Sequence, residues 1–114
     1  MAKADRNDRS ELLPGTLDML ILKTLTRAAL HGYGIARRIE ELSGEVLQVE
    51  EGSLYPALQR LRLNGWVEAE WKETERGRRA RFYRLTVAGR KHLGVEVSEF
   101  DRVIAAIGRV MQEA

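Results

Sequence analysis

Residues 53–85 read SLYPALQRLRLNGWVEAEWKETERGRRARFYRL, and this stretch determines the architecture of the chain. Its beginning has the pattern of a short helix, with Ser53 as a favourable N-cap and Pro56 in the predicted first turn, where a missing N–H costs no intrahelical bond. Spacings of four and three residues place apolar side chains on one face: Leu54, Leu58 and Leu61. The helix is predicted to end at Asn64–Gly65, because glycine readily adopts the left-handed conformation that follows a helix.

After this helix the hydrophobic pattern changes its period. Apolar and charged residues alternate from Val67 to Lys72, as in a half-buried strand. A basic, glycine-containing turn at residues 75–79 leads into a second alternating stretch, in which Tyr83 and Leu85 share a face. A short helix joined directly to a hairpin with an arginine-rich tip predicts a winged helix, a unit that commonly binds duplex DNA.

Two more helices are expected before this unit. The first has Thr16 as its predicted N-cap, with Asp18 in the first turn, and is expected to end near Leu30. The second is predicted at roughly residues 34–43, and the side chains that we expect to point inward are Ile35, Ile39 and Leu42. Tyr33 at the start of this second helix can either reach a DNA phosphate or cover the core, and the sequence leaves both alternatives open.

A long final helix is predicted from Thr86, its N-cap candidate, to the end of the chain. Large apolar residues recur along it at alternating spacings of four and three, the a/d seam of a heptad repeat: Leu93, Val97, Phe100, Ile104, Ile107 and Met111. At roughly 1.5–3 kcal/mol per buried large side chain, such a seam would stabilise an interface by on the order of 10 kcal/mol before ordering costs. We therefore predict a homodimer interface at these residues. The alternative is a helix that folds back on its own domain.

The 114 residues suffice for one domain with a small core, and the expected fold class is mainly α with a small β-hairpin. We expect a flexible arm at residues 1–11, a winged helix-turn-helix domain at 12–86 and a C-terminal dimerisation helix at 87–114. An arm that packs on a partner subunit is the alternative for the first segment. Neither a stretch of ~20 apolar residues nor a signal-peptide pattern is present, so we expect a cytoplasmic location without membrane contact.

Little in the sequence favours catalysis. Acid–base or metal chemistry needs clustered ionisable side chains, but His31 and His92 lie in unrelated segments and the acids follow helix faces at ion-pair spacings. His31, beside a glycine turn, is expected to be structural. The absence of cysteine excludes disulfides and thiolate metal sites. We therefore predict a protein that binds rather than reacts and is not an enzyme, with no cofactor and no metal.

The hairpin is the most basic part of the chain. The net charge is only +2, whereas residues 72–84 contain six Lys or Arg against two Glu. In a helix-turn-helix the second helix presents its first residues to base edges, where Gln59 suits adenine and Arg60 suits guanine or phosphate. Arginines of the hairpin tip would follow the DNA backbone or enter the minor groove. The predicted DNA contacts are Tyr33, Ser53, Tyr55, Pro56, Gln59, Arg60, Arg76, Arg78 and Arg79.

One observation opposes this interpretation, and two alternatives to it remain open. Glu50 and Glu51 precede the predicted Ser53 helix and would repel a phosphate chain, which limits how that helix enters a groove. A solvated hairpin is the plain alternative for the arginines. A winged helix used for protein contacts, with the hairpin arginines meeting an acidic partner, is the main functional alternative.

Several stretches resemble, in order, those of the PadR family of transcriptional regulators: GTLD at 15–18, LHGYGI at 30–35, GSLYPAL at 52–58, GWV at 65–67 and RFYRLT at 81–86, followed by Ala88–Gly89. The resemblance implies a dimeric winged-helix repressor that binds double-stranded DNA at a palindromic operator and often answers to a small aromatic or amphiphilic effector. The single helix after the wing is similar to the short branch of this family.

The resemblance also directs attention to aromatic residues. Multidrug-sensing members of the family use a tryptophan on the last helix to hold flat ligands at the dimer centre. In this chain Phe100 is the only aromatic residue of that helix, which makes it the candidate effector contact. Trp66 and Trp71 lie on the predicted wing strand instead, where packing is the expected role.

Overall fold

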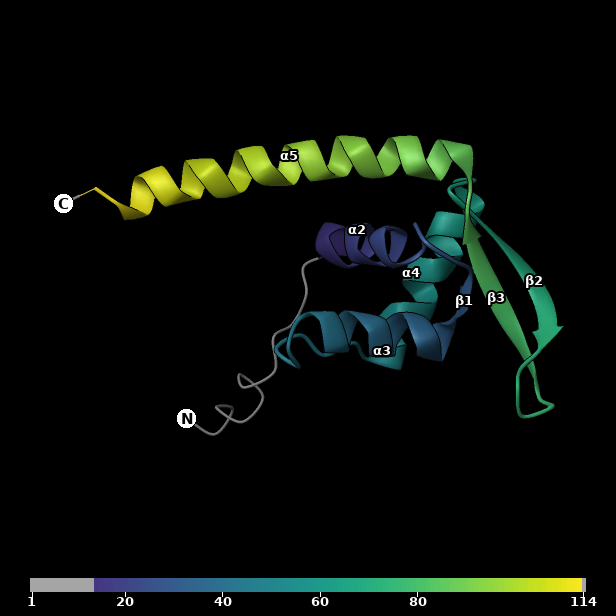
Figure 1. The fold of residues 1–114 in the computed structure, drawn as a ribbon. Helices are drawn as coiled ribbons and strands as arrows, with labels where there is room; N and C mark the ends of the chain where they lie inside the picture. Colours follow the sequence, from purple (N-terminus) through teal and green to yellow (C-terminus); the bar gives the residue numbers. More distant parts are fainter. Residues whose placement is uncertain (1–13, 114) are drawn as a thin grey trace.

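The computed structural model describes residues 14–113, so the predicted arm at residues 1–11 lies outside the described part. Its elements follow in the order α2 (Pro14–Thr24), β1 (Leu30–His31), α3 (Gly32–Leu42), α4 (Glu51–Leu63), β2 (Val67–Glu73), β3 (Arg79–Leu85) and α5 (Val87–Met111), as Figure 1 shows. Three short helices and an antiparallel hairpin form a winged helix-turn-helix, which a single long helix follows. The predicted fold class is confirmed.

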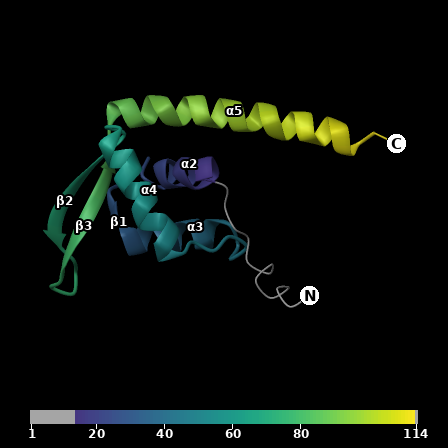
Figure 2. The ribbon, with the colours of Figure 1, turned by 180° about the vertical axis from the view of Figure 1, so that it is seen from behind.

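The hydrophobic core joins these elements into one unit. α2 packs against α3, α4 and α5, and α4 runs down the back of the domain past α2 and α3 (Figure 2). The fully buried large side chains come from three helices and the first strand of the hairpin: Ile21, Leu22, Ile35, Leu54, Leu58, Leu61 and Val67. Because α4 and the base of the hairpin share this core, the two are held in a fixed relation to each other.

The first helix differs from its prediction at both ends. α2 begins at Pro14, which suits a first helical position, so Thr16 lies inside the helix and is not its N-cap. Asp18 consequently falls outside the first turn. α2 ends at Thr24, not near Leu30, because Leu30 and His31 leave the helical path and pair with β3. Tertiary strand pairing overrides the local helical pattern here.

The sheet contains one more strand than the sequence indicated. Its order is β1-β3-β2, with β1 pairing antiparallel to β3 at Leu30–Tyr83 and His31–Phe82. The β2–β3 pairing is the predicted hairpin, with a turn that places Gly77 at φ +80°. Trp71 was expected to pack, but 56% of it is exposed. The outer half of the hairpin extends beyond the helices, so it has no core to cover this side chain.

α3 begins with a histidine cap. The Nδ1 atom of His31 accepts a hydrogen bond from the Gly34 N–H at 3.0 Å, which is the structural role expected for this residue. Ile35 and Ile39 are buried as predicted, but Leu42 is exposed. Leu42 is the last residue of α3 and lies beyond the part of the helix that packs on the core.

α4 starts earlier than predicted. It begins at Glu51, and Ser53 is its third residue rather than its N-cap. Glu50 adopts the extended cap conformation, and its carbonyl accepts from the N–H of Ser53 at 3.0 Å and of Leu54 at 2.9 Å. Pro56 therefore lies in the second turn, not the first, and cannot donate to the carbonyl of Gly52. Gly52 is exposed, so water can satisfy that carbonyl.

The junction between the hairpin and α5 is tightly built. Thr86 caps α5 as predicted, since its Oγ1 accepts from the Gly89 N–H at 2.9 Å, and this hydroxyl also donates to the Gly65 carbonyl at 2.7 Å. The Trp66 and His92 rings stack with centroids 3.5 Å apart and 10° between their planes. These contacts fix the first turns of α5 to the turn that ends α4. Beyond them α5 runs past α2 and away from the rest of the domain (Figure 1).

Candidate nucleic-acid interface

α4 has one face in the core and one in solvent. Leu54, Ala57, Leu58 and Leu61 are buried, which leaves the opposite side of the helix free. Its exposed residues include the predicted base contacts Ser53, Pro56 and Gln59. They lie on the outward side of α4, in contact with solvent.

Arg60 is already engaged. Its Nη2 lies 2.8 Å from Asp18 Oδ1 on α2, in an ion pair that is half exposed on the arginine side. A contact between Arg60 and a guanine would have to compete with this pair. Gln59 is held as well, because its Oε1 accepts from Arg62 Nη2 at 3.1 Å.

Two tyrosines flank the start of α3. Tyr33 is exposed, so it does not cover the core, and its ring stacks on His31 with centroids 6.4 Å apart. Tyr55 on α4 reaches across to Gly32, where an added β-carbon would lie 2.6 Å from the tyrosine hydroxyl. Partial burial raises the pKa of Tyr55, and the nearby Glu51 and Tyr83 raise it further. The Tyr55 phenol therefore stays protonated and can donate a hydrogen bond at neutral pH.

The tip of the wing is organised by Thr74. The N–H of Thr74 donates to the Arg78 carbonyl at 2.6 Å, and its Oγ1 accepts from the N–H groups of Arg76 and Arg78 at 3.3 Å each. The side chains of Arg76, Arg78 and Arg79 are exposed. None of these three arginines forms an ion pair with another described residue. Their charges are available to an anionic partner.

An open groove of about 1090 Å³ lies between the start of α3, α4 and the wing. It brings together five of the predicted DNA contacts: Tyr33, Tyr55, Arg76, Arg78 and Arg79. The other four, on the outward side of α4, do not line it. The groove also contains residues that the sequence reasoning missed: His31, Trp71, Arg81 and Phe82. The register that pairs Trp71 with Arg81 would have revealed these two, since paired strand residues share a face.

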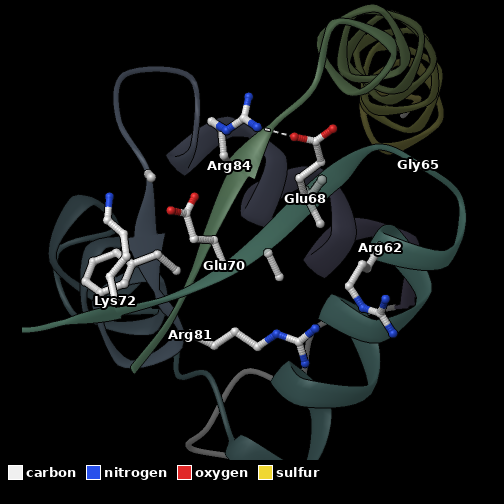
Figure 3. A pocket seen from close by; sticks show the side chains of 11 residues that line it. Arg62, Gly65, Glu68, Glu70, Lys72, Arg81 and Arg84 are labelled. Carbon is white, nitrogen blue, oxygen red and sulfur yellow. Dashed lines mark hydrogen bonds and ion pairs between the residues drawn. The ribbon is translucent and has the colours of Figure 1, made fainter. Parts of the chain in front are cut away.

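A second, smaller pocket of about 510 Å³ lies around β2 (Figure 3). Arg81 from β3 directs its guanidinium group toward α4, whereas the guanidinium group of Arg62 lies along α4, where it donates to Gln59. The Nε atom of Arg81 is buried and has no hydrogen-bond partner among the described residues. Glu68 and Arg84 form an ion pair on the other face of the hairpin.

The predicted seam of α5 forms a stripe along the helix. Val97, Phe100, Ile104, Ile107 and Met111 are all exposed in the single chain, with 49% of Ile104 accessible. Leu93 differs from them because it is 8% exposed and belongs to the hydrophobic core of this chain. Val103 and Val110 are also exposed and widen the stripe.

Within residues 14–113, no group of three or more His, Asp or Glu side chains is placed to hold a metal ion. None of the helices described there has the length and apolarity that crossing a bilayer demands.

Comparisons with known proteins agree with this architecture. The profile of the PadR-like family of transcriptional regulators matches residues 21–95. A protein from Lysinibacillus sphaericus is 30% identical over 104 residues, which cover 91% of this chain and 95% of that protein. A transcriptional regulator from Clostridium thermocellum has a similar structure, with a TM-score of 0.79 and 28% identity over 88% of this chain and 97% of that one. A PadR family regulator from Eggerthella lenta is similar with a TM-score of 0.73 and 26% identity, over 88% of this chain and 85% of that one.

The family match indicates which kind of ligand this surface binds. Transcriptional regulators of this type are not enzymes, which confirms the expectation of a binding protein, and they act on DNA. The basic wing, the exposed side of α4 and the helix-turn-helix core are the parts that such a protein needs. The chain belongs to the PadR-like family of transcriptional regulators.

Proposed function

We propose that this chain is a homodimeric, sequence-specific transcriptional repressor that binds a palindromic operator in the cytoplasm. The observation that carries the proposal is the pairing of two exposed surfaces on one subunit. One is the basic groove beside α4, and the other is the apolar stripe of α5 from Val97 to Met111.

The stripe supports dimerisation. Its side chains recur at heptad spacing and remain exposed in the single chain, although burying each large one would contribute roughly 1.5–3 kcal/mol. A second copy of α5 carries the same seam and can cover it along its length. Leu93 is left out of the proposed interface, because its own subunit buries it.

The groove and α4 support operator recognition. In the proposed complex, Pro56 and Gln59 face base edges in the major groove, while Arg76, Arg78 and Arg79 contact phosphates or the minor groove. Tyr33 and Tyr55 donate to the phosphate chain that crosses the groove between α4 and the wing. Two subunits related by a two-fold axis then read two half-sites about 34 Å apart, which is why the operator is a palindrome.

We further propose that a small aromatic or amphiphilic effector relieves repression by binding near Phe100. Phe100 lies within the apolar stripe and is exposed in the single chain, so it would line a cavity at the dimer centre. An effector there would change how the two α5 helices pack against each other, and this change would alter the distance between the two α4 helices.

Binding to the DNA upstream of the chain's own gene tests the proposal. A mobility shift with that fragment and with a random duplex of equal length should show a preference for the upstream fragment. If a protein that sediments as a dimer bound the two duplexes with equal affinity, the proposal of a sequence-specific repressor would be contradicted.

A protein-contact module is the second candidate, and one observation favours it. Glu51 places a negative charge in the first turn of α4, and Arg60 in the last turn is paired with Asp18, so α4 offers less free positive charge than the wing does. An acidic protein partner would bind the wing alone. If the protein bound no duplex but did bind an acidic polypeptide, this alternative would be favoured.

A further inference from the structure

We propose that Trp71 is a DNA-contact residue that positions Arg79 and Arg81 as phosphate ligands, so that the sugar–phosphate chain in the groove covers its indole ring. The inference rests on the DNA binding proposed above and adds residues that the sequence did not single out.

The hairpin register gathers the three side chains. Trp71 on β2 is paired with Arg81 on β3, and Glu73 is paired with Arg79, so both arginines lie on the same face of the hairpin as Trp71. The guanidinium carbon of Arg79 lies 5.5 Å from the centroid of the Trp71 ring, and that of Arg81 lies 5.9 Å from it. Both cations are within the range of a cation–π contact with one indole.

Folding of the single chain does not account for this arrangement. Val67, on the same strand face, is buried, whereas more than half of Trp71 is in solvent. Two like charges held at one ring repel each other, and neither arginine forms an ion pair within residues 14–113. The exposed indole lies beside one exposed cation, Arg79, and one half-buried cation, Arg81, and neither arginine has a carboxylate partner within the described residues, which suits an anionic ligand.

The groove around this cluster fits a DNA strand. Trp71, Arg79 and Arg81 line the groove that Tyr33 and Tyr55 border, and the arginines of the wing tip extend it. Phosphate oxygens accept charge-assisted hydrogen bonds from guanidinium groups, and the apolar face of a deoxyribose can pack on an indole.

Arg81 links the cluster to α4. It lines both the groove and the smaller pocket, and its guanidinium points toward α4 on the side where Arg62 lies (Figure 3). Its Nε is buried and has no partner among the described residues, so a phosphate at this edge would meet the terminal Nη atoms of the guanidinium. A duplex seated there would contact the wing and the reading helix together, which favours DNA over an acidic peptide that meets the wing alone.

Tryptophan emission gives a direct test, because the chain contains only two tryptophans. In the Trp66→Phe variant all tryptophan emission comes from Trp71. We expect acrylamide to quench this emission readily in the free protein and several-fold less in the presence of a duplex. Backbone contacts do not depend on sequence, so a random duplex at low salt is a sufficient probe.

Because Trp66→Phe disturbs the stack between Trp66 and His92, the variant Trp71→Phe, which keeps that stack, serves as the control. Trp71→Phe leaves Trp66 as the only emitter, and its quenching should not change when DNA is added. With Trp66 retained, Trp71→Leu should weaken binding roughly three- to tenfold, whereas Trp71→Phe, which keeps an aromatic ring, should retain most of the affinity. The slope of log K against log salt should fall by about one to two in Trp71→Leu, because the two arginines are no longer held at the groove.

The outcomes separate this inference from the proposed function. If the protein shifts a duplex but acrylamide quenches Trp71 as strongly in the complex as in the free protein, the inference is overturned while DNA binding stands. An unchanged affinity and salt slope in Trp71→Leu would overturn it in the same way. Failure to shift any duplex would overturn both.

Discussion

Gly89 lies directly against the backbone carbonyl of Trp66, so that a β-carbon at position 89 would be 2.0 Å from that oxygen. This contact joins the first turn of α5 to the residue that follows the α4 turn. With the Thr86 hydrogen bonds and the Trp66–His92 stack, it sets the direction in which α5 leaves the domain. In a dimer formed through α5, the same contact would fix how far apart the two α4 helices lie.

Gly89→Ala should therefore destabilise the protein by about 1–3 kcal/mol, because the added methyl group meets backbone rather than a side chain that can move. Gly94→Ala on the same helix is the matched control, since nothing lies within 4 Å of its added β-carbon. The control should stabilise α5 by up to ~1 kcal/mol through better helix propensity. Urea unfolding measures both; equal effects of the two substitutions would show that the contact is unimportant.

Thr86→Ala removes the hydroxyl that caps α5 and donates to Gly65. We expect a loss of about 1–2 kcal/mol in the free energy of unfolding, from one cap and one tertiary hydrogen bond. Thr86→Ser keeps the oxygen and should recover most of that loss. A serine variant as unstable as the alanine variant would mean that the threonine methyl group matters instead.

Ile104→Asp places a charge in the middle of the exposed stripe of α5. In the proposed dimer this charge would be buried without a partner, and the protein should become monomeric. Ala105→Asp puts the same charge on the adjacent, outward heptad position and should leave the dimer intact. Sedimentation velocity of both variants gives the answer, and a dimeric Ile104→Asp protein would place the interface elsewhere.

The wing should control the salt dependence of DNA binding. Replacing Arg78 and Arg79 by Ala should lower the slope of log K against log salt by about 0.9 for each phosphate that the wing no longer neutralises. Arg84→Ala is a control in the same hairpin, because Arg84 lies on the opposite face and pairs with Glu68. If Arg84→Ala changed the slope as much as the double variant, the DNA would lie on the other face.

The raised pKa of Tyr55 predicts an alkaline limit on stability. Burial disfavours the phenolate, so the folded protein holds this proton to higher pH than the unfolded chain does. The contribution is complete below the unfolded pKa of about 10 and is lost as pH rises through the folded pKa. Tyr55→Phe should lack this component. Urea unfolding of both proteins across this alkaline range tests it, and parallel curves would contradict the assignment.

The sequence predicted the hairpin well because its alternation is strong. Val67, Tyr83 and Leu85 are buried as expected, and Gly65 adopts the positive φ that ends α4. The sequence did not predict β1, because a strand of two residues is too short to show alternation and the helical pattern before it extends to Leu30. The start of α4 was misplaced because Ser53 is a good cap by composition, while Glu50 takes the extended conformation instead.

The interface was harder to predict than the fold, because its contacts are long-range. Arg60 and Asp18 are 42 positions apart, and no local pattern indicates that they pair. The exposure of Trp71 depends on where the helices stop beneath the sheet, which alternation alone cannot reveal. The register of the hairpin is the missing information in that case.

The proposed dimer requires that two subunits joined through α5 place two copies of α4 and the wing on one duplex. Hydroxyl-radical footprinting of the DNA upstream of the chain's own gene is the sharpest test of this requirement. We predict two protected half-sites related by a two-fold axis, with centres about 34 Å apart along the duplex. Protection of a single half-site, or no protection beyond that of a random duplex, would contradict it.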